Sequence, residues 1–214
     1  MRLIEHDPLT RVRYKNISYI KIPKCASCSM QHAMKMKLPR VNHKQAVITY
    51  EVDDTEILFT VIRNPVDRWI SGVLMYYTEF KVPELQDTIL DDILLPSIRQ
   101  GKLIFDCHTV PMVYYLYPFE NKPIQLFKLN SLQNLPLELH IPNKNKSSIQ
   151  KHNRIYTTIS NCFNNSEFRT RFNQIYKDDI TLFNDMKITY SGPTGYVNFD
   201  TELAQFISGN NASL

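Results

Sequence analysis

Residues 56–72 read EILFTVIRNPVDRWISG, a stretch that passes from a strand pattern into a helix pattern. The segment 56–62 is almost continuously apolar, which is typical of a parallel strand covered on both faces. Asn64 is a favourable helix cap, and Pro65 suits the first turn of a helix. Apolar residues then recur at helical spacing and predict one buried helix face, formed by Val66, Trp69, Ile70, Val73 and Tyr77.

The rest of the chain continues this alternation of strands and helices. Segment 17–22 is rich in β-branched and aromatic residues and ends at Pro23, so it reads as a strand. We expect further helices over 27–37, 85–99 and 168–183, and a third strand over 124–129. This order predicts an α/β fold: a single domain with a mostly parallel central sheet flanked by helices. In this reading 136–153 is a loop and the tail 208–214 frays.

Composition agrees with one globular domain that spans residues 1–214. Hydrophobic residues make up 43% of the chain and charged residues 21%, which is ordinary for a folded protein. A net charge of +4 makes the surface mildly basic and suits an anionic ligand. It does not reach the clustered Lys and Arg of a nucleic-acid binder, so nucleic acid is not an expected partner.

The sequence also indicates a compartment. No run approaches the roughly 20 apolar residues that cross a bilayer, and residues 1–8, MRLIEHDP, lack the apolar stretch of a signal peptide. Four scattered cysteines are too few for a disulfide scaffold and favour a reducing compartment: Cys25, Cys28, Cys107 and Cys162. We therefore expect a soluble, cytoplasmic protein without stable membrane insertion.

A first candidate motif is IPKCASCS, residues 22–29, where the first strand leads into a helix. Backbone N–H groups at a helix start attract anions, Lys24 adds a charge, and Ser27 and Ser29 add hydroxyl donors. Taken alone, the same residues fit a plain helix cap with a solvated lysine equally well. A nucleotide-kinase P-loop is excluded because it needs two glycines and the first glycine of the chain is Gly72.

The spacing Cys25-x-x-Cys28 allows a redox dithiol as an alternative, since a helix start lowers a thiol pKa. A zinc site would need a second ligand pair, for which Cys107 with His108 is a poor substitute. Nothing else in the sequence is thioredoxin-like, so the redox interpretation is the weaker one.

The second motif is Arg63-Asn64-Pro65-x-x-Arg68-x-x-Ser71. Together the two motifs resemble the sulfotransferase superfamily that uses 3′-phosphoadenosine 5′-phosphosulfate (PAPS), in its carbohydrate (Golgi-type, heparan 2-O-like) branch. Residues 23–29 are similar to the 5′-phosphosulfate loop of that family, and 63–71 to its 3′-phosphate motif. The resemblance implies a P-loop-NTPase-like sulfotransferase fold.

Physical reasoning agrees with this resemblance. Arg63 at a strand end can grip a phosphate with its planar fork, and Ser71 lies two turns into the helix, off the core stripe. The alternative is a local ion pair between Arg63 and Asp67, with Ser71 solvated. Arg68 is expected to be structural rather than a ligand.

Two weaker similarities extend the match along the chain. Residues 106–112 resemble the family segment Asp-x-His-x-x-Pro-Gln, with Met112 in place of Gln. Tyr176-x-x-Asp179-x-x-x-Phe183 resembles a Tyr-x-x-Asp motif near the family's C-terminal end. Cys28 is a departure, because it stands where a threonine commonly donates to the 5′-phosphate, and a thiol is a weaker donor.

The resemblance implies transfer of a sulfuryl group from PAPS to an acceptor hydroxyl, with a carbohydrate as the expected acceptor and PAP, adenosine 3′,5′-bisphosphate, as the product. Lys24 would neutralise the bridging oxygen, while Arg63 and Ser71 hold the 3′-phosphate. The 5′-phosphosulfate would be held by Lys24, Cys25, Ala26, Ser27, Cys28 and Ser29. No metal is required.

The acceptor hydroxyl needs a general base. Residues between the two motifs that qualify are His43, Glu51, Asp53, Asp54 and Glu56. His43 lies about twenty residues ahead of Arg63, similar to the catalytic histidine of heparan 2-O-sulfotransferases, and Glu51 could supply the glutamate of other branches. His108 is the reserve, as a base or as a contact to the acceptor.

Two other function classes stay open. One is a nucleotide-dependent kinase with an atypical loop, and the other is a non-catalytic protein that binds nucleotides or glycans on the same fold. The sequence shows no membrane anchor of the Golgi type, which favours a prokaryotic or viral source.

Overall fold

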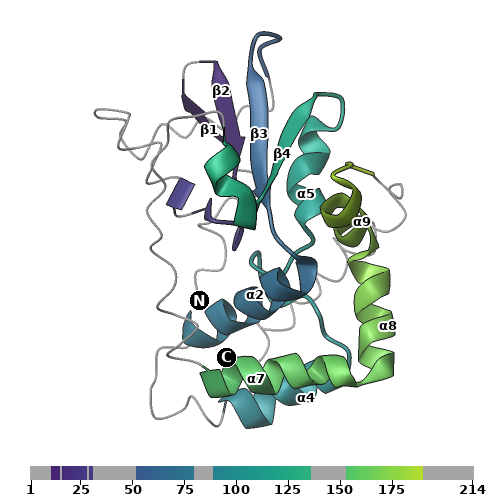
Figure 1. The fold of residues 1–214 in the computed structure, drawn as a ribbon. Helices are drawn as coiled ribbons and strands as arrows, with labels where there is room; N and C mark the ends of the chain where they lie inside the picture. The colour runs from purple at the N-terminus through teal and green to yellow at the C-terminus, as the bar shows by residue number, and fades with distance from the viewer. Residues whose placement is uncertain are drawn as a thin grey trace, which may run out of the picture.

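The computed structural model describes residues 11–14, 16–27, 29–30, 52–79, 89–135 and 153–189. One four-stranded sheet has the order β1-β2-β3-β4 (Figure 1). The strands are β1 (Arg11–Tyr14), β2 (Ile17–Ile20), β3 (Ile57–Ile62) and β4 (Ile124–Lys128). The last three are parallel, and β1 forms an antiparallel pair with β2. The α/β fold with a mostly parallel sheet is confirmed, and β1 is an addition that the sequence pattern did not predict.

The central strand β3 is buried on both faces, as its apolar run predicted. All of its residues except Ile57 are buried. Leu58 and Ile62 pack on one face against α5 (Met112–Leu116) and Leu182 of α9 (Lys177–Asp185). Phe59 and Val61 pack on the opposite face in a separate cluster with Met30 and Leu135. These shared contacts show that α5 and α9 cover one face of the sheet, and Figure 1 shows α5 next to β4 with α9 further out.

Helix α2 (Pro65–Glu79) begins immediately after β3. Asn64 caps it, because its Oδ1 accepts hydrogen bonds from the backbone N–H of Val66 at 3.0 Å and of Asp67 at 3.2 Å. The predicted stripe is confirmed: four of its members are at most 2% exposed, and Val66 is partly buried. The stripe faces a second core, which includes Phe168 and Phe172 of α8 (Ser166–Ile175). In this core the indole of Trp69 donates to the Leu103 carbonyl at 2.7 Å.

The remaining helical segments are η3 (Ile89–Leu94), α4 (Leu95–Arg99), η4 (Tyr117–Phe119), η5 (Leu129–Asn134), α7 (Asn153–Asn161), η6 (Cys162–Asn164) and α8 (Ser166–Ile175). Most of them line that second core, whereas η4 packs with the cluster of α5 and η5 follows β4. Of the expected helix over 85–99, residues 89–99 are described and form a π-helical and then an α-helical segment, while 85–88 lie outside the described residues. The helix expected over 168–183 is two helices, α8 and α9, separated at Tyr176. Residues 27, 29 and 30 are helical, while 31–37, residues 136–152 of the expected loop and the tail lie outside the described residues. Asn153, the last residue of the expected loop, begins α7 instead.

No helix within the described ranges has both the length and the apolar character needed to cross a membrane.

Gly72 lies where α2 packs against the segment that follows Phe105. A Cβ atom built on Gly72 would lie 2.5 Å from the His108 carbonyl oxygen and 3.0 Å from Cγ2 of Thr109. Only a residue without a side chain allows this approach, so Gly72 fixes the distance between α2 and the turn that carries His108.

We predict that Gly72→Ala destabilises the protein by about 1–3 kcal/mol, the usual effect of forcing extra volume into a packed contact. Chemical denaturation at constant pH measures this difference. Met75→Ala, on a more exposed part of the same helix, is the control and should have a smaller effect. A Gly72→Ala variant as stable as the wild type would show that α2 can move away from the turn at little cost.

Candidate functional site

The two sequence motifs meet at the carboxyl edge of the sheet. Lys24 follows β2 and Arg63 follows β3, and these strands are parallel neighbours. The Arg63 guanidinium donates to the Lys24 carbonyl oxygen at 3.4 Å. Two cationic residues 39 positions apart in sequence therefore lie in one place, at the edge where open α/β sheets bind ligands.

The loop after β2 has an uncommon backbone. Lys24 and Ala26 have φ angles of 65° and 60°, in the left-handed region that residues with a side chain rarely occupy. The amide of Met30 bonds the Ala26 carbonyl at 2.9 Å and so begins a helix directly after the loop. Left-handed residues in a tight loop turn successive N–H groups toward a common centre, which is the geometry of anion-binding nests. Strain of this kind concentrates at functional sites.

The serines of the loop lie inside the fold. Ser27 and Ser29 are each 7% exposed, and Lys24 is partly buried. Cys28 lies outside the described residues. Cys25 is fully buried, and its Sγ lies 3.7 Å from Sδ of Met112.

The environment of Cys25 argues against a redox dithiol. Burial raises the pKa of the Cys25 thiol to about 11, although the nearby charges of Arg68 and Arg63 act in the opposite direction. A reactive thiol of the Cys-x-x-Cys type needs a lowered pKa and access to solvent. Cys25 has neither, so its contribution to a site comes from its backbone.

Arg68 is structural, as expected. Its side chain is 1% exposed, and Nε donates to the Pro23 carbonyl at 3.0 Å while Nη1 donates to the Val110 carbonyl at 2.5 Å. One guanidinium thus joins α2, the loop after β2 and the segment before α5. Within the described residues Arg63 makes no ion pair with Asp67, which removes the local alternative for Arg63. Ser71 is partly buried on α2.

The two segments that carry the weaker similarities, 106–112 and 176–183, contact each other. The buried Asp179 carboxylate accepts hydrogen bonds from the backbone N–H of Met112 at 2.7 Å and of Val113 at 2.9 Å. The hydroxyl of Tyr176 donates to the carbonyls of Leu103 and Thr109. Burial raises the pKa of Asp179 to about 6, against the lowering effect of Arg68 and of the two N–H donors. These contacts hold the segment 103–113 in place against α9.

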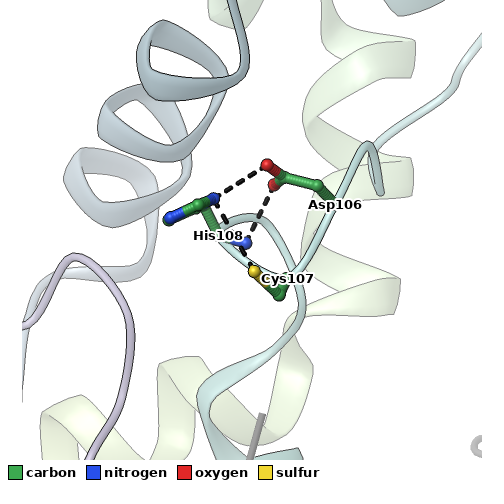
Figure 2. Close-up of side chains that lie close together, drawn as sticks. All are labelled: Asp106, Cys107 and His108. Atoms are coloured by element: carbon green, nitrogen blue, oxygen red, sulfur yellow. Dashed lines mark hydrogen bonds and ion pairs between the residues drawn. The ribbon is translucent and has the colours of Figure 1, made fainter. Parts of the chain in front are cut away.

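His108 and Asp106 form a close pair on this segment (Figure 2). Nδ1 of His108 lies 2.8 Å from Oδ2 of Asp106, and the His108 backbone N–H donates to Oδ1 at 2.8 Å. Burial alone would lower the pKa of His108, but hydrogen bonds with Asp106 and Cys107 and the charge of Asp106 raise it to about 9. At neutral pH the ring is therefore protonated, which does not suit a general base.

Asp106, Cys107 and His108 also bring three ligand-type atoms within 4.8 Å of one another, close enough to hold a metal ion. However, both carboxylate oxygens of Asp106 bond His108, and Nδ1 takes part in one of these bonds. The arrangement is that of an ion pair, and we assign no metal ligand to it.

Three of the candidate bases lie at the wrong end of the sheet. Asp53, Asp54 and Glu56 precede β3, whereas Lys24 and Arg63 follow parallel strands. A six-residue strand separates the two edges by about 20 Å. Glu56 is also buried in an ion pair of 2.7 Å with Arg11. The expectation that these three carboxylates could serve as the base is wrong, while His43 and Glu51 lie outside the described residues.

Lys128 is a residue at this edge that the motif search missed. It is paired in register with Ile62, so it ends β4 beside the position where Arg63 leaves β3. Its ammonium lies 4.6 Å from the centre of the Phe183 ring. Its place at the end of the third predicted strand is the signal that could have identified it.

No protein-family model, no curated protein and no solved structure matches the chain. The functional argument therefore depends on the residues and geometry described above.

Proposed function

We propose that this chain is a sulfotransferase that moves a sulfuryl group from PAPS to an acceptor hydroxyl, with a carbohydrate as the acceptor class. The observation that carries the proposal is the contact between Arg63 and the Lys24 loop at the ends of neighbouring parallel strands. The similarity of both motifs to those of carbohydrate sulfotransferases adds the identity of the donor.

The donor carries two separate anionic groups and needs two cationic sites. In the proposal the left-handed loop 23–29 holds the 5′-phosphosulfate, because its backbone favours an anion and Lys24 adds a charge. Arg63 and Ser71 hold the 3′-phosphate. Arg63 suits this role because its planar guanidinium can form two parallel hydrogen bonds with a phosphate.

The chemistry is an in-line displacement at sulfur. The acceptor oxygen forms a bond to sulfur while the bond from sulfur to the 5′-phosphate oxygen breaks, and PAP leaves with the electron pair of that bond. The hydroxyl proton passes to a base on the protein. Lys24 offsets the charge that develops on the leaving oxygen, so catalysis depends on positioning and electrostatic stabilisation.

The base comes from the interval between the motifs. The carboxylates of 53–56 lie at the opposite edge of the sheet, which leaves His43 and Glu51 from the sequence candidates. Either residue can accept a proton near neutral pH when its surroundings tune its pKa.

We predict that PAP stabilises the protein against heat, with or without EDTA. At a concentration 100 times its dissociation constant, a ligand of the native state adds about 2.7 kcal/mol of apparent stability. A thermal-shift series with PAP, AMP and ATP–magnesium measures this, and labelled-sulfate transfer from PAPS to a panel of glycans measures the activity. Stabilisation by ATP–magnesium without any by PAP would indicate a kinase, and PAP binding without transfer would indicate a non-catalytic binder.

Arg63→Ala should remove most of the preference for PAP over AMP, because only PAP carries the 3′-phosphate assigned to Arg63. The loss of a charge-assisted hydrogen bond is worth about 1.5–3 kcal/mol. Isothermal titration of both nucleotides gives the ratio of their affinities. Arg169→Ala, which removes an exposed arginine of α8, is the control for net charge. Equal weakening of PAP and AMP by Arg63→Ala would place Arg63 at another part of the ligand.

Variants of the two base candidates should separate binding from turnover. The variant that removes the true base, His43→Ala or Glu51→Gln, should lower kcat by about 10²–10⁴-fold and leave PAP affinity nearly unchanged. Lys24→Ala should reduce both quantities, because Lys24 is assigned to the donor. Single-turnover transfer and PAP titration provide the two measurements. Full activity in both base variants would exclude His43 and Glu51 together.

A further inference from the structure

The turn that carries His108 is built to hold one imidazole ring in a fixed orientation. Both oxygens of Asp106 bind His108, one at the backbone N–H and one at Nδ1. The Thr109 hydroxyl accepts from the N–H of Phe105 at 2.8 Å and of Asp106 at 3.1 Å, and it donates to the Asp106 carbonyl at 2.9 Å. The Tyr115 hydroxyl donates to the Cys107 carbonyl. A turn bound at so many points positions its side chains before any ligand arrives.

This turn lies against the elements of the donor site. Gly72 of α2, the neighbour of Ser71, contacts the His108 carbonyl. The Arg68 guanidinium donates to the carbonyl of Val110, two residues after His108, and also to the Pro23 carbonyl of the Lys24 loop. Cys25 contacts Met112 in the same region. The segment 108–112 therefore forms a third side next to the two motifs.

The outer nitrogen of the His108 ring is available to a ligand. Figure 2 shows Nε2 at the end of the ring that points away from Asp106, on the side where α2 is drawn. Among the described residues, Nε2 has no hydrogen-bond partner, and the side chain is 14% exposed. A held ring with one nitrogen bound to a carboxylate and the other available is the arrangement by which proteins direct a histidine at a ligand.

The surroundings of the ring favour its charged form. Asp106 is its direct partner and Cys107 adds a weaker contact. The tyrosines that interact with Asp106 from neighbouring elements are Tyr76 of α2, Tyr115 of α5 and Tyr176, and burial raises the pKa of each, so all three are neutral at physiological pH. Two further charged groups, Arg68 and Asp179, are hydrogen-bonded to the backbone of the segment after His108.

We propose that His108, positioned by Asp106, donates a hydrogen bond from Nε2 to an oxyanion of the ligand, and is therefore a binding cation rather than the general base. The inference rests on the proposed function for the nature of that oxyanion, a phosphate or sulfate oxygen of the donor or a sulfate or carboxylate on the acceptor. Lys24, Arg63 and His108 are then three cations on three sides of one region, an arrangement that an anionic ligand stabilises.

The primary test compares His108→Gln and Asp106→Asn with the wild type over pH 6.5–10, with PAP as the probe. Affinity for PAP in the wild type should fall as pH rises through about 9, where the ring loses its proton. His108→Gln should bind PAP about 10-fold or more weakly at pH 7.5, as expected for a hydrogen bond to a charged group, and should lack this step. In Asp106→Asn the step should move toward pH 6.5, the ordinary pKa of histidine. Asp91→Asn, which removes an exposed carboxylate of η3, is the matched control.

The wild-type protein provides a second readout that needs no variant. The His108 ring signals in an NMR titration give its pKa directly, and their shift on adding PAP, inorganic sulfate or a sulfated disaccharide identifies which oxyanion contacts the ring. A response to PAP supports a donor oxyanion. A response to the sulfated disaccharide alone, together with a raised KM for that acceptor in His108→Gln, supports an acceptor oxyanion. No response to any probe, with unchanged affinities in both variants, overturns the proposal.

Stability against pH checks that Asp106 acts through His108. The pKa of His108 is higher in the folded state than in the unfolded state, so its contribution to stability is complete below about pH 6.5 and is lost as pH rises through about 9. The urea midpoint of the wild type should fall over this window more than that of Asp106→Asn. The midpoint at pH 6 also shows whether each variant is folded.

Two outcomes separate this inference from other possibilities. Tight zinc binding that depends on both Asp106 and His108, with PAP affinity unchanged in the variants, would identify a metal site and overturn the proposal. If PAP fails to bind the wild type, the proposed sulfotransferase function fails. The response of the His108 ring to inorganic sulfate still decides the oxyanion proposal in that case.

Discussion

The buried guanidinium of Arg68 is the interaction on which the arrangement of the site depends. It joins the Pro23 carbonyl and the Val110 carbonyl from a position on α2, so three segments distant in sequence share one donor group. A charge without solvent is costly unless hydrogen bonds satisfy it, and loss of the arginine would leave two buried carbonyls without this partner. The left-handed residues Lys24 and Ala26 lie one and three positions after Pro23. Such strained backbone persists only where its surroundings fix it, and Arg68 is part of those surroundings.

The local sequence pattern was enough to predict the strand and the helix near this arginine, but it did not predict the contacts between the elements. The apolar run of β3, the Asn64 cap and the stripe of α2 each follow from neighbouring residues, and the structure has all three. The short helix α5 and the division at Tyr176 have hydrogen-bond partners 66 or more positions away in sequence, whereas β1 pairs with its neighbour β2 and was missed for lack of a clear local pattern. Gly72 illustrates the difference, because its importance comes from the His108 carbonyl, 36 positions later. No periodicity reveals such a contact.

The candidate site shows the same division between what the sequence could and could not provide. Residue type and the position after a strand were sufficient to select Lys24 and Arg63, which lie together. Strand direction alone could have excluded Asp53, Asp54 and Glu56, because residues before a strand lie at the opposite edge from those after it. His108 was selected as a base or an acceptor contact from its type and the resemblance. Its charge depends on the rotation of the ring toward Asp106, which is a property of the folded turn.

A protonated His108 divides the tasks of the proposed reaction between two parts of the chain. Transfer requires one group that accepts the acceptor's proton and others that neutralise charge on the donor, and a single imidazole cannot be deprotonated for the first task and protonated for the second. Asp106 commits His108 to the charged form up to about pH 9. The base must then come from another segment and must be deprotonated at a lower pH. Both requirements are met only in the interval between the two pKa values, so the proposed transfer would be fastest there. In the proposed reaction, a fixed carboxylate beside one histidine would therefore set the upper limit of the working pH range, while the base would set the lower one.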